Sequence, residues 1–203
     1  MSEPSARDAI LLAVRAARPP AVAAPAPRVA SLASSSPGEP SVLDAFAAAA
    51  TTAGAAVVLG ERTDVARLSL GADVQSLEVL STVGEVASTI AAPSGPHGLA
   101  SLDLFVTEAT VGVAENGAVW IATADVLHRA ALFLATRVVI VMRAGSIVPT
   151  LHDAYERIDL RAHAFGVFVA GPSKTADIEQ SLVVGAHGPK ELTLIVTGGG
   201  ERT

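Results

Sequence analysis

The 203-residue sequence contains no cysteine. It can form no disulfide, and it cannot supply the thiolate ligands of an iron–sulfur cluster or of a cysteine-ligated zinc site. The histidines also lack the His-x-His and His-Glu-x-x-His spacings of metal sites. No metal site is therefore predicted, and His187 is the one histidine that merits a test. Any redox centre is therefore expected on a partner.

Basic charge is also scarce. The sequence has 14 Lys and Arg residues against 20 Asp and Glu residues, and its net charge is −6. Binding to nucleic acid or to an anionic membrane surface depends on neutralising phosphates with Lys and Arg. Neither kind of partner is predicted.

Long apolar runs are absent. The longest stretches, such as Ala56–Leu59 and Val138–Met142, are far shorter than the ~20 residues of a membrane-spanning helix. The N-terminus carries Glu3 and Asp8 and only the short apolar run Ala9–Val14, which differs from a secretory signal. We therefore expect no transmembrane segment and a cytoplasmic location.

Apolar residues make up 50% of the chain and charged residues 17%, a composition typical of a folded protein. Residues 1–40 are expected to form an N-terminal extension. Apolar residues at helical spacing over Asp8–Arg18 predict an amphipathic helix that docks on another surface. Pro19–Pro40 is rich in Pro, Ala and Ser and is typical of a linker or arm. Residues 41–203 are expected to form one α/β domain.

Helical and extended patterns alternate within residues 41–203. Ser41 is a candidate N-cap for a helix that runs through Ala53 and stops at Gly54. Further helices are predicted at Asp64–Leu70 and Asp73–Leu80. Strands are predicted at Ala55–Gly60, Asp103–Ala109, Gly112–Thr123, Arg137–Arg143, Ala164–Ala170 and Leu192–Thr197. This alternation favours an α/β fold with a mostly parallel sheet.

Alternating apolar residues flank the pair Asn116-Gly117, a pattern that predicts a hairpin with a two-residue type I′ turn. Glu115 directly precedes the turn. A carboxylate held rigidly at the rim of a sheet is suited to act as a nucleophile or proton acceptor. The alternative is a solvated hairpin residue without a chemical role. The lone aromatic residues Trp120 and Tyr155 are expected to be packing groups.

The segment Gly171–Leu192 reads GPSKTADIEQSLVVGAHGPKEL and follows a predicted strand. Ligands gather at the carboxyl ends of strands in open α/β sheets, where a helix N-terminus offers N–H groups to an anion. The predicted donors to such an anion are Gly171, Ser173, Lys174 and Thr175. The alternative is a Gly-Pro turn and a helix cap, with Asp177 and Glu179 as favourable charges in the first helical turn. The spacing of a Walker loop is missing.

The same segment resembles the C-terminal signature of the lactate utilization protein C family, the LutC/YkgG proteins with a LUD domain. The resemblance extends to SARDAILLAVRAA, to Ser41–Gly60, to VTEATVGVAENGAVWI and to VVIVMRAGSIVPTLHDAYERI. The middle block of the family reads Glu-Thr-Gly-Thr where this chain has Glu115-Asn116-Gly117-Ala118. Two hydroxyl groups of the family pattern are therefore missing here.

The resemblance implies a three-layer α/β/α fold with a mostly parallel sheet, similar to the NagB/RpiA/CoA-transferase group. It implies a component of a cytoplasmic L-lactate oxidation complex that converts lactate to pyruvate together with iron–sulfur companion subunits. This component would lack a cluster of its own and would carry a pocket for a small anion or cofactor. Carried over residue by residue, the site comprises Glu115 as the catalytic candidate and Gly117, Gly171, Ser173, Lys174, Thr175, Asp177 and Glu179 as ligand-binding candidates.

Two other functions stay open. The sequence Glu-Asn-Gly is similar to the segment that carries the nucleophilic glutamate in one CoA-transferase family, and Glu115 would then form an acyl anhydride followed by a thioester. Against this reading, the first half of the compact domain has no glycine-rich CoA-binding segment. The third possibility is a non-catalytic ligand-binding or regulatory protein, because a family does not fix an activity.

Overall fold

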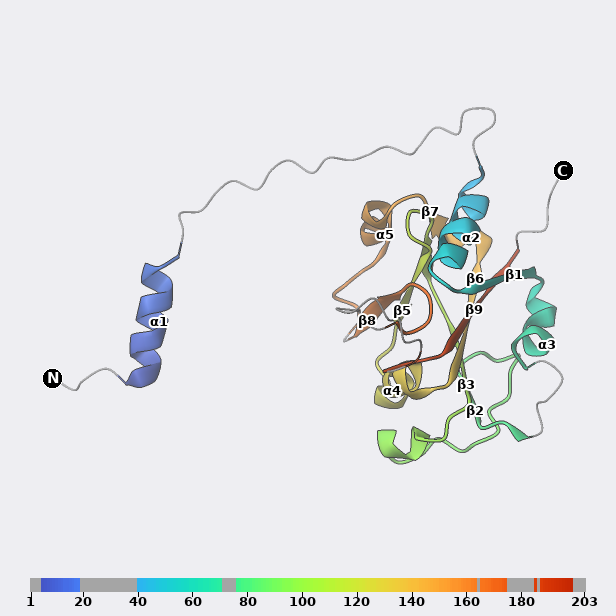
Figure 1. Ribbon diagram of the computed structural model, residues 1–203, viewed down its shortest axis with the longest axis horizontal. Coiled ribbons are helices and arrows are strands. Elements are labelled where there is room, and N and C mark those ends of the chain that lie inside the picture. The colour runs from blue at the N-terminus through green and yellow to red at the C-terminus, as the bar shows by residue number, and fades with distance from the viewer. Residues whose placement is uncertain are drawn as a thin grey trace. The chain divides into compact units, whose positions relative to one another are not determined.

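The computed structural model describes residues 5–18, 40–70, 76–163, 165–174, 185 and 187–198 (Figure 1). The chain divides into two compact units, Met1–Ala30 and Ser31–Thr203. The first contains helix α1 (Ala6–Ala16), which confirms the predicted N-terminal helix with bounds shifted by two residues. Ser5 caps α1 by accepting a hydrogen bond from the backbone N–H of Asp8. None of the side chains of α1 is buried.

A five-stranded sheet forms the centre of the second unit, and all its neighbouring strands are parallel. Its order is β1 (Ala56–Gly60), β9 (Glu191–Thr197), β6 (Arg137–Arg143), β3 (Leu104–Glu108) and β2 (Val79–Ser81). Strand β6 is an almost continuous apolar run because helices cover both of its faces. The predicted mostly parallel sheet is confirmed.

Helices cover both faces of this sheet. Helices α2 (Val42–Thr52) and α4 (Val126–Leu134) pack on one face, and α3 (Val65–Leu70) packs on the other (Figure 1). The alternation of side chains along β6 serves both faces, since Ile140 faces α2 and α4 while Val139 faces α3. The predicted three-layer α/β/α arrangement is confirmed. Ser41 is the N-cap of α2 and accepts from the backbone N–H of Asp44, also as predicted.

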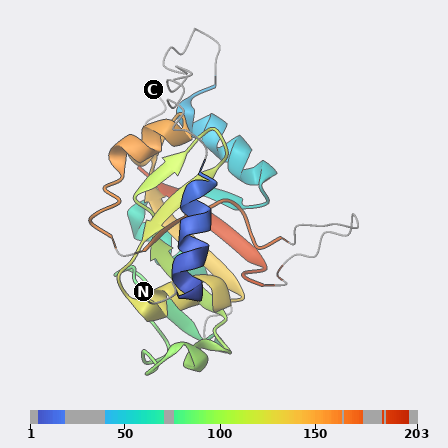
Figure 2. The same ribbon diagram turned by 90° about the vertical axis from the view of Figure 1, so that its left-hand side faces the viewer.

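A second, four-stranded sheet lies beside α2 and α4. Its order is β7 (Ile147–Val148), β4 (Val111–Val113), β5 (Ala118–Ala122) and β8 (Gly166–Val169). Helix α5 (Leu151–Arg157) covers its outer face, and both α2 and α5 contact β7 at one end of the sheet (Figure 2). Trp120 is buried there against Phe168, with ring centroids 4.8 Å apart, which confirms its packing role. Short 3₁₀ helices complete the described elements: Arg62–Asp64, Pro96–Leu99 and Ala144–Ser146.

Two predicted elements differ from the structure. The helix predicted over Asp73–Leu80 is wrong in its described part, residues 76–80, because Val79 and Leu80 enter strand β2. Their side chains are buried on opposite faces of the sheet, the period of a strand. The predicted type I′ turn is also wrong. Val113 pairs with Ala118, so the hairpin loop has four residues, and the Asn116 side chain accepts from the N–H of Ala118 (3.0 Å) as in an Asx-turn.

Candidate functional site

Glu115 lies in the β4–β5 loop with an exposed side chain. Its Oε2 accepts a hydrogen bond from the backbone N–H of Leu151 (2.9 Å), the first residue of α5. Its own N–H donates to the carbonyl of Pro149 (3.0 Å). The carboxylate is thus held at the start of a helix, where negative charge is favourable. The nucleophile predicted at Glu115 stays a prediction, and the structure adds a structural role for the same side chain.

Gly117 and Gly171 both lie against helix α2. Gly117 has φ 69°, and a Cβ there would stand 2.2 Å from the backbone nitrogen of Ala50. Gly171 has φ 75°, and a Cβ there would stand 2.1 Å from the carbonyl oxygen of Ala53. The hairpin loop and the segment after β8 therefore meet at the C-terminal half of one helix. Both glycines are required by close backbone packing and by left-handed conformation.

The described part of the predicted anion segment also contacts α2. The Nζ of Lys174 donates to the carbonyl oxygen of Ala53, the C-cap of that helix, where a cation is favourable. Ser173 is held through its backbone, which donates to Pro189 (2.9 Å) and accepts from Gly185 (2.9 Å). Lys174 thus caps a helix in this geometry.

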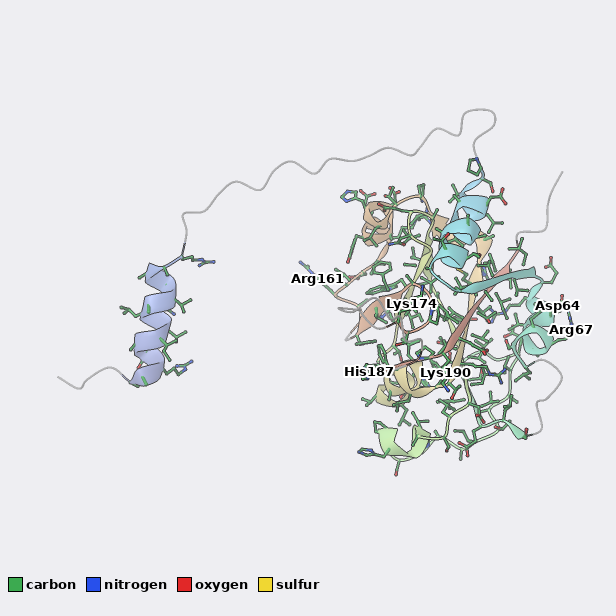
Figure 3. All side chains as sticks on the ribbon, viewed as in Figure 1. Asp64, Arg67, Arg161, Lys174, His187 and Lys190 are labelled. Carbon is green, nitrogen blue, oxygen red and sulfur yellow. The ribbon has the colours of Figure 1, made fainter. Side chains whose placement is uncertain are left out.

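A cavity of about 340 Å³ borders this segment and is lined by Gly171, Ser173, His187 and mostly apolar neighbours. Figure 3 places Lys174 and His187 on the side of the parallel sheet that carries α4, away from Asp64 and Arg67 at α3. Strand β8 belongs to the smaller sheet and is antiparallel to β5. The segment therefore does not follow a strand of the parallel sheet. Thr175, Asp177 and Glu179 lie outside the described residues, and the anion site predicted over Gly171–Glu179 stays a prediction.

The carboxyl ends of the parallel strands surround two adjoining cavities of about 590 and 420 Å³. Both are lined by Arg62, which follows β1, and by Arg143 and Ser146, at and after the end of β6. Glu108, the last residue of β3, lines one cavity. Glu61, Gly145, Thr197 and Gly198 line the other. We call the two cavities together the carboxyl-edge crevice.

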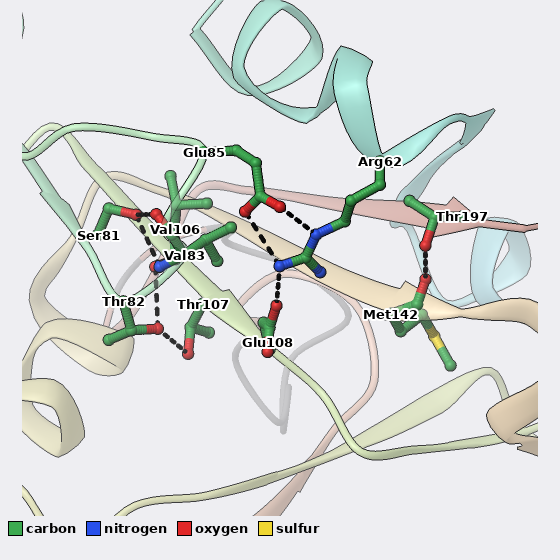
Figure 4. Close-up of polar contacts among 10 residues, drawn as sticks. All are labelled: Arg62, Ser81, Thr82, Val83, Glu85, Val106, Thr107, Glu108, Met142 and Thr197. Atoms are coloured by element: carbon green, nitrogen blue, oxygen red, sulfur yellow. Dashed lines mark hydrogen bonds and ion pairs between the residues drawn. The ribbon is translucent and has the colours of Figure 1, made fainter.

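Arg62 is bound by two carboxylates, those of Glu85 and Glu108 (Figure 4). Its Nη2 lies 3.0 Å from Oε2 of Glu85 and also pairs with Glu108, while its Nε pairs with Glu85. Hydrogen bonds from Arg62 lower the pKa of Glu85, and hydrogen bonds to Glu85 and then Glu108 raise the pKa of Arg62. The guanidinium is thus neutralised by the protein, and it connects the ends of three strands.

Arg143 has a different environment. It is exposed and has no carboxylate partner within the residues that the structure describes. It pairs in register with Thr197, whose hydroxyl donates to the carbonyl of Met142 (3.2 Å). The hydroxyl of Ser146 donates to the carbonyl of Arg143 itself (2.7 Å), which closes the turn after β6. Among the described residues, Arg62 of the crevice is thus paired with carboxylates and Arg143 is not.

The sequence prediction included none of these crevice residues. Arg143 and Thr197 each end a predicted strand, and Glu108 is the last residue but one of another. The rule for open α/β sheets therefore indicates the strand ends, but it does not say which ends lie together. Gly198, the residue after strand β9, also lines the crevice. In the ranges that the structure describes, no three metal-ligating side chains converge. No helix of these ranges is both long and apolar enough to cross a membrane.

A family model for the LUD domain matches residues 44–197. Lactate utilization protein C from Geobacillus sp. (strain WCH70) is 34% identical over 98 residues, which are 45% of this chain and 40% of that protein. The protein of the same name from Bacillus subtilis (strain 168) is 33% identical over 98 residues, again 45% and 40% of the two chains. This chain thus matches less than half of the length of these curated relatives.

A DUF162 family protein from Deinococcus radiodurans has a similar crystal structure. The TM-score is 0.61 at 20% identity, and the similarity covers 77% of this chain and 96% of that one. At this identity the similarity supports the fold alone.

Proposed function

Because the chain belongs to the LUD domain family, we propose that it is the non-iron–sulfur component of a system that oxidises L-lactate to pyruvate. The observation that carries this proposal is the similarity to proteins named lactate utilization protein C. The proposed partners are companion subunits with iron–sulfur clusters, and the proposed location is the cytoplasm.

Redox chemistry supports the proposal that the iron–sulfur clusters lie on companion subunits. Oxidation of lactate to pyruvate releases two electrons and two protons, and the electrons need an acceptor. Clusters of the usual kind are held by cysteine thiolates, and this sequence has no cysteine. In the proposal, the companion subunits accept the electrons, while this chain binds a small anionic ligand and contacts the companions.

The test is an anaerobic purification of the tagged full-length chain from cells grown on lactate. We expect cysteine-rich proteins and lactate-dependent dye reduction to co-purify, and we expect the activity to fall when this chain is removed and to return when it is added back. The same purification from cells grown on another carbon source is the control. A companion pair that oxidises lactate at its full rate without this chain would contradict the proposal.

The acyl-transfer alternative requires Glu115 to react as a nucleophile. After treatment with an acyl-CoA and borohydride, the peptide that contains Glu115 would show a mass shift, and the Glu115→Gln variant is the control. An unchanged mass would end this alternative. The non-catalytic alternative predicts that Glu115→Gln and Asp177→Asn, made separately, leave the activity of the complex unchanged.

A further inference from the structure

The carboxyl-edge crevice is placed where open α/β sheets bind small molecules. Strands β1, β9, β6 and β3 are parallel, and their carboxyl ends meet at this one edge. Ligands of such sheets bind in the crevice outside the carboxyl ends of the strands. The two cavities, about 590 and 420 Å³, are within the usual size range of small-molecule sites. Arg62, Arg143 and Ser146 line both cavities, so the two adjoin.

The crevice contains both carboxylates and arginines, Glu61 and Glu108 among the former, and an anionic ligand is favoured only at one position. Glu85 and Glu108 already neutralise Arg62, which leaves it little to offer a ligand. Arg143 has no such partner in the part of the chain that the structure describes. Its planar guanidinium matches the geometry of a carboxylate or a phosphate group. Arg143 is therefore the cation to which an incoming anion would bind.

Gly145 independently indicates a ligand site in the larger cavity. Its φ lies outside the left-handed range, and a Cβ there would meet no atom within 4 Å in the part of the chain that the structure describes, its two chain neighbours excepted. Neither backbone conformation nor internal packing explains a glycine at this position, yet Gly145 lines the larger cavity two residues after Arg143. A position without a side chain allows a ligand to approach the backbone closely.

We propose that the carboxyl-edge crevice is the binding site of a small organic anion, whose carboxylate or phosphate group is held by Arg143 beside the backbone of Gly145 and Ser146. This assignment does not depend on the proposed role in lactate oxidation. Carboxylates such as L-lactate and pyruvate share their oxyanion chemistry with phosphate compounds, and the experiment distinguishes the two sources.

The experiment is a titration of the ¹⁵N-labelled full-length chain, followed by NMR, with L-lactate, pyruvate and inorganic phosphate in separate series. We expect at least one series to shift the amide signals of Gly145, Ser146 and Gly198 saturably. A carboxylate that binds more tightly than phosphate identifies an organic acid as the ligand, and the reverse order identifies a phosphate compound.

Variants expected to weaken the binding of the anion are compared with one expected to strengthen it. Arg143→Gln is expected to weaken binding at least about tenfold, as for the loss of a charge-assisted hydrogen-bonded pair. Glu108→Gln is expected to strengthen binding about threefold, because it removes a negative charge from the crevice and releases one side of Arg62. Gly145→Ala is expected to weaken binding without lowering the melting temperature.

Two matched controls accompany these variants. Arg137→Gln removes a cation from the other end of the same strand. Gly95→Ala changes a glycine that, like Gly145, has open space around its Cβ position, but it does not line the crevice. Both controls are expected to bind normally. The proposal is overturned if all three probes leave the crevice amides unshifted. It is also overturned if the shifts centre on Gly171–Lys174, or if Arg143→Gln and Arg137→Gln weaken binding equally.

Discussion

Single glycine residues fix how the hairpin loop packs on helix α2. We predict that Gly117→Ala lowers the free energy of unfolding by about 2–4 kcal/mol, because the new methyl group would overlap the backbone of Ala50. Gly198→Ala is the control, since Gly198 also has a positive φ but no described residue beyond its chain neighbours comes near its Cβ position. Its cost is about 1 kcal/mol, from backbone strain alone. Urea unfolding measures both, and equal losses would contradict the close contact with α2.

Lys174 tests whether a residue of the family signature binds a ligand or stabilises the fold. Its ammonium group donates to the last turn of α2, so Lys174→Met is expected to lower the melting temperature. If the cap is its only role, the affinity for inorganic phosphate stays unchanged. Arg161→Met, an exposed cation elsewhere on the second unit, is the control. A loss of phosphate affinity in Lys174→Met with an unchanged melting temperature would instead support the anion site predicted at Gly171–Glu179.

At the scale of elements, the sequence predicted the helices and strands whose formation depends mainly on neighbouring residues in the chain. Strand β6 has the bounds predicted for it, Arg137–Arg143. The prediction succeeded because a short apolar run between two arginines is typical of a buried strand. The helix predicted over Asp73–Leu80 is wrong in its described part because pairing of Val79 and Leu80 with β3 outweighed the local pattern. Helices α4 and α5 and strand β7 have no counterpart among the predicted elements. Strand β7 has only two residues and carries no periodic signal.

The candidate site residues also fall into those that the sequence predicted and those that it did not. Glu115 and the segment from Gly171 were found through contiguous signatures in the sequence. Glu108, Arg143 and Gly198 come from separate strand ends, and only the parallel register brings them to one edge. Sequence spacing contains no record of that register, so the crevice could not be assembled from the sequence alone.

Helix α4 depends on a carboxylate cap. Asp125 accepts from the backbone N–H groups of His128 and Leu127, and these hydrogen bonds lower its pKa. A carboxylate with a lowered folded-state pKa stabilises the fold above its unfolded pKa, and this contribution is lost as the pH falls through the folded value. We therefore predict that Asp125→Ala lowers the urea midpoint at pH 7 and that the difference from the parent narrows below the ordinary carboxyl range.

The pH series has an internal control. Glu156 is exposed on α5, and its carboxylate lies 3.7 Å from His152 without a backbone partner among the described contacts. Glu156→Ala is expected to leave the urea midpoint nearly unchanged at pH 7. A difference between Asp125→Ala and the parent that persisted unchanged into strong acid would show that the cap acts through something other than its charge.

At the scale of the whole molecule, the two units allow folding to be separated from partner binding. Helix α1 buries no side chain, and its apolar residues Ile10 and Val14 are 64% and 63% exposed. Removal of residues 1–40 is therefore expected to leave the melting temperature of the remaining chain unchanged, as measured by circular dichroism. A fall of several degrees would mean that the N-terminal helix packs on the second unit in solution.

In the proposed complex, the apolar residues of α1 are a candidate contact for a companion subunit, because apolar surface gains free energy when it is covered. We predict that Ile10→Lys with Val14→Lys abolishes co-purification of the cysteine-rich companions while phosphate or lactate binding at the crevice persists. Arg7→Gln, on the same helix, is expected to co-purify normally. If the double variant still retains its companions, they bind the second unit, and the search for their contact moves to the exposed α4 residues Phe133 and Leu134.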